Sequence, residues 1–117
     1  MHELSICRSI ADIVSRHAAG RSVSTVRVRI GQLRQVVPET LVYCWSLVSE
    51  GTPLDGSRLE VESVPAAIRC RGCDHRRVLD APILACDACG SRDVEIVSGE
   101  EFLVTSLDLA EAENGAR

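Results

Sequence analysis

Two segments of the chain place apolar residues every three or four positions, which is the spacing of an amphipathic helix. In the first segment one apolar stripe is formed by Leu4, Cys7, Ala11, Val14 and Ala18, and a second stripe beside it by Ile6, Ile10 and Ile13. This helix is expected to stop near Gly20. The second helix is predicted to start at Pro38 and end at Gly51, with one face formed by Leu41, Cys44, Trp45 and Val48.

Three further segments alternate between apolar and polar residues, which is the pattern of strands. They cover residues 26–30, 59–64 and 103–109. The order of elements predicts an α+β fold, a three-stranded sheet covered by two helices, with a cysteine-rich segment inserted before the last strand. We expect two domains, residues 1–65 plus 99–117 and residues 66–98, with a small hairpin over 76–79 in the second.

The cysteine-rich segment contains two CxxC motifs, Cys70-Arg71-Gly72-Cys73 and Cys86-Asp87-Ala88-Cys89. Each motif turns two thiolates toward one point, and two such turns supply the four soft ligands that tetrahedral Zn²⁺ prefers. The spacing predicts a structural zinc ribbon, with Gly72 and Gly90 adopting positive φ in its turns. Two redox motifs, two disulfides and a rubredoxin-like iron site are the alternatives.

Composition narrows the choice of function. The chain has 117 residues and a formal net charge of −4, which opposes nucleic-acid binding, although arginines make the ribbon locally basic. A zinc-ribbon nucleic-acid or transcription-associated module is therefore the alternative function. No apolar run is long enough to span a membrane and no signal peptide is evident, so we expect a reducing, cytoplasmic location.

Enzymatic chemistry has no support in the sequence. There is no Ser/His/Asp arrangement, no phosphate-binding loop and no pair of catalytic carboxylates. Cys7 and Cys44 lie on apolar helical faces, so we expect them to be structural thiols. The sequence therefore predicts a metal-binding protein that is not an enzyme.

The first residues, Met1-His2-Glu3, form a second candidate metal site. The Met1 amine, the deprotonated His2 amide and His2 Nδ1 can close two fused chelate rings around one ion. These nitrogen donors lie in a plane, which suits Ni²⁺ or Cu²⁺ better than Zn²⁺. A merely solvated histidine is the alternative interpretation.

The whole chain resembles the HypA/HybF family of hydrogenase-maturation nickel chaperones. The resemblance rests on the MHEL start, Arg29-Ile30-Gly31, Pro38-Glu39-Thr40-Leu41, Tyr43-Cys44-Trp45, Leu59 and the paired CxxC motifs followed by Gly90-Ser91. It implies delivery of Ni²⁺ to the active site of NiFe-hydrogenase, with a HypB-type GTPase and the hydrogenase large subunit as partners and no role for nucleic acid or membrane. The chain itself is expected to be a monomer or weak dimer.

The same resemblance implies the ligands. Nickel, the transferred cargo, would be held by the Met1 amine, the His2 side chain and amide, and the Glu3 amide. The structural zinc would be held by Cys70, Cys73, Cys86 and Cys89. One departure is that His75 is the only histidine near the cysteine motifs, whereas some family members place several there.

Overall fold

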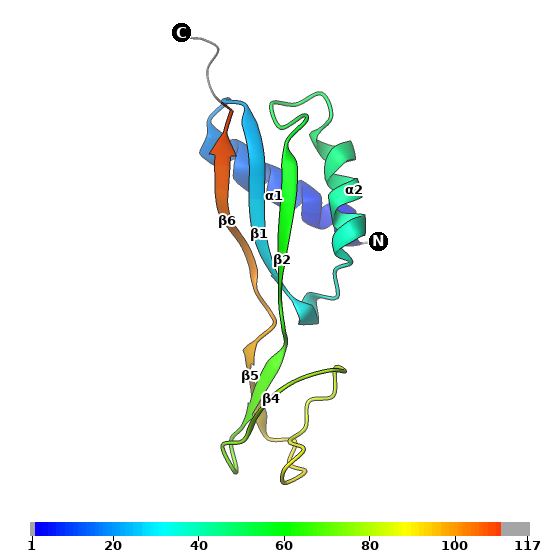
Figure 1. The fold of residues 1–117 in the computed structure, drawn as a ribbon, viewed down its shortest axis with the longest axis vertical. Helices are drawn as coiled ribbons and strands as arrows, with labels where there is room; N and C mark the ends of the chain where they lie inside the picture. The colour runs from blue at the N-terminus through cyan, green and yellow to red at the C-terminus, as the bar shows by residue number, and fades with distance from the viewer. Residues whose placement is uncertain (1, 111–117) are drawn as a thin grey trace. The chain divides into compact units, whose positions relative to one another are not determined.

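The computed structural model describes residues 2–110 and contains two α-helices, one short 3-10 helix and two three-stranded sheets (Figure 1). The elements in chain order are α1 (His2–Ala18), β1 (Val23–Gly31), η1 (Gln32–Arg34), α2 (Pro38–Ser49), β2 (Arg58–Val64), β3 (Ala67–Cys70), β4 (Arg76–Val78), β5 (Val94–Ser98) and β6 (Phe102–Leu109). The predicted helices and the strands over 26–30, 59–64 and 103–109 are confirmed.

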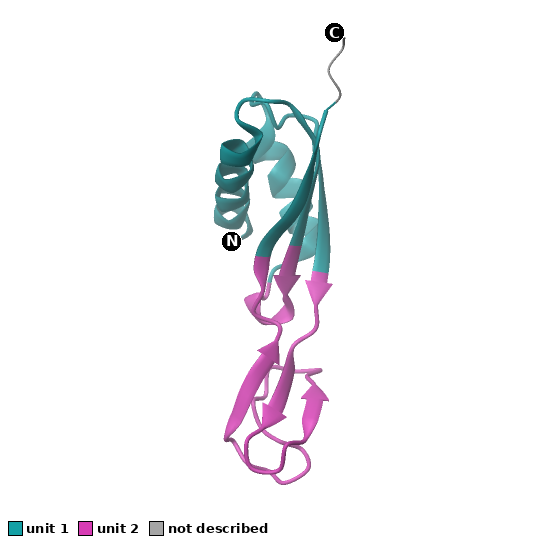
Figure 2. Cartoon of the chain, turned by 90° about the vertical axis from the view of Figure 1, so that its left-hand side faces the viewer, with its two compact units in different colours: residues 1–28, 36–62, 103–117 teal, residues 29–35, 63–102 magenta. Residues whose placement is uncertain are grey.

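The chain divides into two compact units (Figure 2). Unit 1 comprises residues 1–28, 36–62 and 103–117, and unit 2 comprises residues 29–35 and 63–102. Unit 1 holds both helices and most of the sheet ordered β2-β1-β6. Figure 2 shows α1 and α2 on the same side of these strands. The predicted bounds, 1–65 plus 99–117 and 66–98, stay a prediction.

The core of unit 1 lies between the helices and the sheet. Its largest fully buried side chains are Trp45, Ile10, Leu41, Leu54, Val14, Val26, Val28 and Cys7. Trp45 can be buried at little cost because its indole Nε1–H donates to Ser57 Oγ over 2.9 Å. Within residues 2–110, no helix is both long enough and apolar enough to cross a bilayer.

The buried stripe of α1 differs from the predicted one at its first position. The helix buries Cys7, Val14 and Ala18 as expected, but Leu4 is 37% exposed. Glu3 is buried in its place. The prediction for Leu4 is wrong because apolarity was the only criterion, whereas this helix begins with a buried carboxylate.

On the face of the sheet opposite the buried valines of β1, Arg27 links all three strands of unit 1. Its guanidinium donates to both carboxylate oxygens of Asp108 on β6, at 3.2 and 3.0 Å, and to Glu60 on β2 at 3.1 Å. Thr105 on β6 also donates its hydroxyl proton to the backbone oxygen of Arg27. Because these charges are partly exposed, they fix the register of the sheet more than they add to stability.

Unit 2 is built on the second sheet, ordered β4-β3-β5, in which β3 pairs antiparallel with both neighbours. Pairing of residues 76–78 in a small hairpin is confirmed, and their partner is β3, which lies before the first CxxC motif. Ala66, Ile68 and Leu79 form the small buried core, and Leu33 of η1 packs against them. The core of unit 2 therefore includes a residue of η1, which is far away in sequence.

Backbone hydrogen bonds hold η1 within unit 2. Gly31 N–H donates to Glu101 O over 2.7 Å, and Leu33 N–H donates to Gly99 O over 2.8 Å. The side chain of Gln32 accepts a further hydrogen bond from Ala66 N–H. A Cβ atom on Gly31 would lie 2.0 Å from the carbonyl carbon and oxygen of Gly99. Gly31 is therefore required by close backbone approach, since its φ of −74° suits any residue.

We predict that Gly31→Ala destabilises the protein by about 1–3 kcal/mol, because the added methyl group must displace the Gly99 backbone. Gly20→Ala is the matched control, since Gly20 has positive φ but open space around it, and it should cost about 1 kcal/mol at most. Urea unfolding of the zinc-loaded proteins measures both. Equal destabilisation in the two variants would contradict the close-approach explanation.

Candidate metal centres

The structure brings the four cysteines of the CxxC motifs together in unit 2. Their Sγ atoms all lie within 4.8 Å of one another, and two of the pairs, Cys70–Cys89 and Cys73–Cys86, are 3.6 Å apart. Tetrahedral zinc with Zn–S bonds of about 2.3 Å separates its sulfurs by about 3.8 Å. The donor set and its spacing therefore fit one zinc ion, with no coordination position left open for a substrate.

The two CxxC motifs fold in the same way. Cys70 N–H donates to the carbonyl oxygen of His75, and Cys86 N–H donates to that of Ser91, both over 2.8 Å. Each contact spans five residues and closes the turn that carries the second cysteine of its motif. The first cysteine of each motif is buried and the second is exposed. The two motifs thus share the same backbone hydrogen bond and the same order of buried and exposed cysteine.

A residue with positive φ follows each motif. Asp74 has φ 64° and Gly90 has φ 78°, and both donate their backbone N–H to the first cysteine carbonyl over 2.9 Å. The prediction for Gly90 is confirmed, but that for Gly72 is wrong: Gly72 does not adopt positive φ. Aligning the two motifs would have identified Asp74, because aspartate tolerates this conformation better than most residues.

Backbone amides prepare the first cysteine of each motif for ionisation. Donation from Cys89 N–H is the largest cause that lowers the pKa of Cys86 to about 6. The pKa of Cys70 is lowered in the same way, chiefly by Cys73 N–H. Thiolates bind metal and thiols do not, so these two cysteines are the ones prepared for a metal ion. The neighbouring sulfurs raise the pKa of Cys73 to about 12 and that of Cys89 above its usual range, so a metal ion must displace the protons of these two.

Ion pairs surround the cluster. His75 Nε2 lies 2.9 Å from Asp87 Oδ1, which joins the turn after the first motif to the second motif. Arg77 Nε lies 3.6 Å from the other oxygen of Asp87. Arg69 contacts Asp74 and Glu95 at 2.6 and 2.7 Å, and its guanidinium lowers the pKa of Glu95.

These pairs change the interpretation of the local basic charge. Arg71 also contacts Asp93 at 3.0 Å, so three of the ribbon's arginines, Arg69, Arg71 and Arg77, face carboxylates of the same unit. Their charge is balanced inside the ribbon. This arrangement counts against the alternative of a nucleic-acid-binding module, which needs unbalanced positive charge to meet phosphates.

The second candidate site lies at the beginning of α1. Met1 lies outside the described residues. His2 is the first residue of α1 and its side chain is exposed, so its imidazole is accessible to an ion from solvent. Glu3 is only 4% exposed. The two neighbours therefore differ: His2 faces solvent, whereas the Glu3 side chain points into the protein.

The carboxylate of Glu3 binds the start of α2. Val37, the N-cap residue of α2, donates its backbone N–H to Glu3 Oε2 over 3.0 Å. This hydrogen bond is the largest cause that lowers the pKa of Glu3 to about 2. Glu3 is therefore ionised at neutral pH, and its negative charge lies at the positive end of the α2 dipole. From the sequence only the amide of Glu3 was expected to have a role, and the burial of its carboxylate is a finding of the structure.

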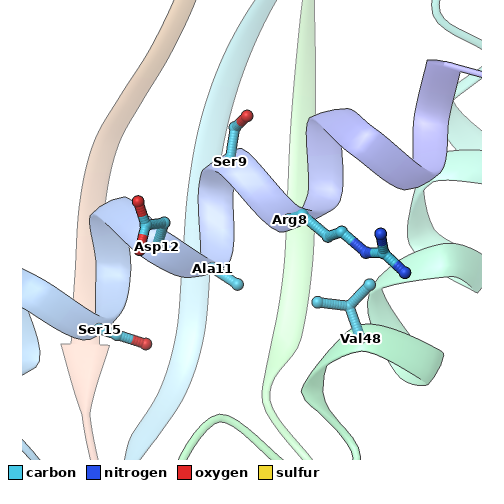
Figure 3. Close-up of a pocket in the computed structure, with 6 residues that line it drawn as sticks. All are labelled: Arg8, Ser9, Ala11, Asp12, Ser15 and Val48. Atoms are coloured by element: carbon cyan, nitrogen blue, oxygen red, sulfur yellow. The ribbon is translucent and has the colours of Figure 1, made fainter.

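Other candidates are structural. Cys7 is fully buried and its Sγ–H donates to Leu41 O over 3.2 Å, as expected for a core thiol. His17 contacts the carbonyl oxygen of Ile13 through Nδ1 at 2.9 Å. A shallow depression between α1 and α2 is lined by Arg8, Ser9, Ala11, Asp12, Ser15 and Val48 (Figure 3). Figure 3 shows Arg8 extended beside Val48 while Ser9 points away, so the polar groups do not converge.

The comparisons with known proteins all identify the same family. Residues 1–109 match the family model described as hydrogenase/urease nickel incorporation, metallochaperone, hypA. The chain is 41% identical to the hydrogenase maturation factor HypA of Geotalea uraniireducens, over 93% of this chain and 99% of that protein. It is 35% identical to the factor of the same name from Desulfosudis oleivorans, over 95% of this chain and 100% of that one.

Solved structures support the fold. The solution structure of the Ni metallochaperone HypA from Helicobacter pylori aligns with a TM-score of 0.67 at 24% identity, covering 93% of this chain and 97% of that one. A second solution structure, of a HypA protein, aligns with a TM-score of 0.60 at 24% identity. At this identity the likeness shows the shared fold of helices and sheets alone.

We predict that Cys70→Ala loses zinc and unfolds unit 2 while the helices of unit 1 stay folded. Three thiolates leave an incomplete site, and the apolar cluster of Ala66, Ile68 and Leu79 is too small to replace it. Metal analysis and amide NMR spectra measure the two effects. Cys44→Ala is the matched control, since Cys44 lies in α2 outside the cluster. Full zinc retention by Cys70→Ala would refute the assignment.

Proposed function

The chain belongs to the HypA family of nickel metallochaperones for hydrogenase maturation, and from this premise we propose that it delivers Ni²⁺ to the NiFe-hydrogenase active site. It acts by binding and transfer and is not an enzyme. The observation that best supports a specific loading site is the exposed His2 at the beginning of α1, beside the anchored Glu3.

In this proposal the nickel ligands are the amine of Met1, the amide nitrogen and Nδ1 of His2, and the amide nitrogen of Glu3. Four nitrogens in one plane suit Ni²⁺, which gains from this geometry, whereas Zn²⁺ does not. Amides in the first turn of a helix have no acceptor within the helix, so chelation there does not interrupt the helical ladder of α1.

The same site suits release. Its donors come from adjacent residues at one end of the chain, so an acceptor can approach the ion and displace them one at a time. Because chelation removes amide protons, nickel binding weakens as the pH falls. A carrier needs both properties, since it must hold the ion during transfer and give it up at the destination.

Zinc has a separate role. Cys70, Cys73, Cys86 and Cys89 would hold it as a closed structural ion, and its contribution is to the folding of unit 2. The nickel donors belong to unit 1. The cargo and the structural ion therefore have different donor chemistry, nitrogen for nickel and sulfur for zinc, which limits exchange between them.

The family resemblance supplies the partners of the proposal. We propose that a HypB-type GTPase and the hydrogenase large subunit are the macromolecules with which the chain exchanges nickel, in the cytoplasm, as a monomer or weak dimer. The absence of a phosphate-binding loop in this chain is consistent with nucleotide hydrolysis being the partner's contribution.

We predict that His2→Ala weakens nickel binding at least about tenfold, by removing the imidazole ligand, while zinc content and helicity stay unchanged. His17→Ala is the matched control, because His17 is another exposed histidine of the same helix. Calorimetric titration of untagged, zinc-loaded protein measures the affinity.

An extension before Met1 tests the same site independently, since it converts the amine into a weakly binding amide. The extended protein should show the same loss as His2→Ala. Equal nickel affinity and stoichiometry in wild type, His2→Ala and the extended protein would refute the amino-terminal site. His75 would then be the next candidate nickel ligand.

A further inference from the structure

Glu3 is the one charged residue among residues 2–110 whose side chain is buried. A buried carboxylate is costly unless hydrogen-bond donors compensate for the water it has lost. Here a compensating donor is the backbone N–H of Val37, 3.0 Å from Oε2. An apolar residue would satisfy the amphipathic pattern of α1 at this position more simply, so the carboxylate serves a purpose other than core packing.

The contact joins two helices that are separated in sequence. Val37 is the N-cap of α2, and no side chain of its own supplies a cap. In a capping box, a Glu at the third helical position accepts the hydrogen bond of the N-cap N–H. In α2 that position is Thr40, and Glu3 of α1 makes the contact instead. Both views place the start of α1 beside the first turns of α2 (Figures 1 and 2).

We propose that Glu3 is a positioning residue for the nickel chelate: its carboxylate fastens the first turn of α1 to Val37, and so holds in place the backbone to which the chelating nitrogens belong. The inference rests on the proposed nickel site. Within it, one residue has two roles, since the Glu3 amide nitrogen binds the ion and its side chain binds the protein. His2, next to it, stays exposed for the ion to reach.

Anchoring has a physical benefit for a short chelate. A free amino-terminal tripeptide must give up backbone freedom when it wraps around an ion, whereas a tripeptide fixed at its third residue has already lost part of it. Groups that orient metal ligands without touching the metal typically change metal affinity by about 10–100-fold. Because Glu3 orients only part of the ligand set, we expect its effect at the lower end of this range.

The test compares Glu3→Ala with Glu3→Gln in the untagged, zinc-loaded protein. Both variants keep the Glu3 amide, so the proposed ligand set is intact. Glutamine retains an oxygen that can accept the Val37 N–H, and alanine does not. We expect Glu3→Ala to bind Ni²⁺ about tenfold more weakly and release it faster to a competing chelator, and Glu3→Gln to recover most of the loss.

The absorption band of planar nitrogen-bound Ni²⁺ distinguishes positioning from ligation. It should be unchanged in wild type and in both Glu3 variants, since the donor atoms are the same. If Glu3→Gln is as weak as Glu3→Ala and the band shifts in both, the carboxylate is a ligand or a charge partner of the ion, and the positioning role is wrong.

A second pair of variants tests the other side of the contact without altering the amino-terminal residues. Val37→Pro removes the N–H donor, and the φ of −88° at this position is close to that of proline. Val37→Ala keeps the donor and is the control. Val37→Pro should lower nickel affinity, and adding it to Glu3→Ala should cost little more, because both changes break the same Glu3–Val37 hydrogen bond.

Helix content by circular dichroism and zinc content verify that each variant is folded. Wild-type affinity in Glu3→Ala and Val37→Pro, with His2→Ala still defective, would overturn the positioning role and leave the nickel site standing. Unchanged affinity in His2→Ala as well would instead overturn the proposed nickel site. The two failures are therefore distinguishable in one set of titrations.

Discussion

Four sulfurs held within 4.8 Å of one another cannot all be ionised unless a cation lies among them, and the structure of unit 2 depends on this constraint. The buried apolar core of the unit is too small to hold its turns and short strands alone. The two CxxC turns are closed by equivalent backbone hydrogen bonds, from Cys70 N–H and from Cys86 N–H, and these bonds hold the sulfurs close together. A bound zinc ion would attract all four thiolates and so outweigh their mutual repulsion, which would stabilise the fold of unit 2.

Local patterns explain what could be predicted from the sequence. The helical stripe through Cys7 and Val14, the alternation along β1 and the spacing of the CxxC motifs each depend on neighbours in the chain, so they can be recognised without coordinates. The convergence of the four sulfurs could also be predicted, because paired CxxC motifs are a known pattern of zinc sites.

The remaining features depend on partners that are distant in sequence. β4 pairs with β3 across the first cysteine turn, and Leu33 of η1 packs against the core of unit 2. Neither contact can be predicted from the pattern of neighbouring residues. The burial of Glu3 was missed for a related reason: its donor, Val37, is 34 residues away, and composition alone assigns a carboxylate to the surface.

The buried thiol of Cys7 has a consequence for a protein that handles soft and borderline metal ions. Burial raises the pKa of Cys7 to about 12, and its proton is engaged by the carbonyl oxygen of Leu41. At cellular pH this sulfur is therefore almost entirely protonated and shielded from solvent. Stray copper or zinc therefore finds no ionised sulfur at Cys7, although this thiol lies on the same helix as the proposed amino-terminal nickel site.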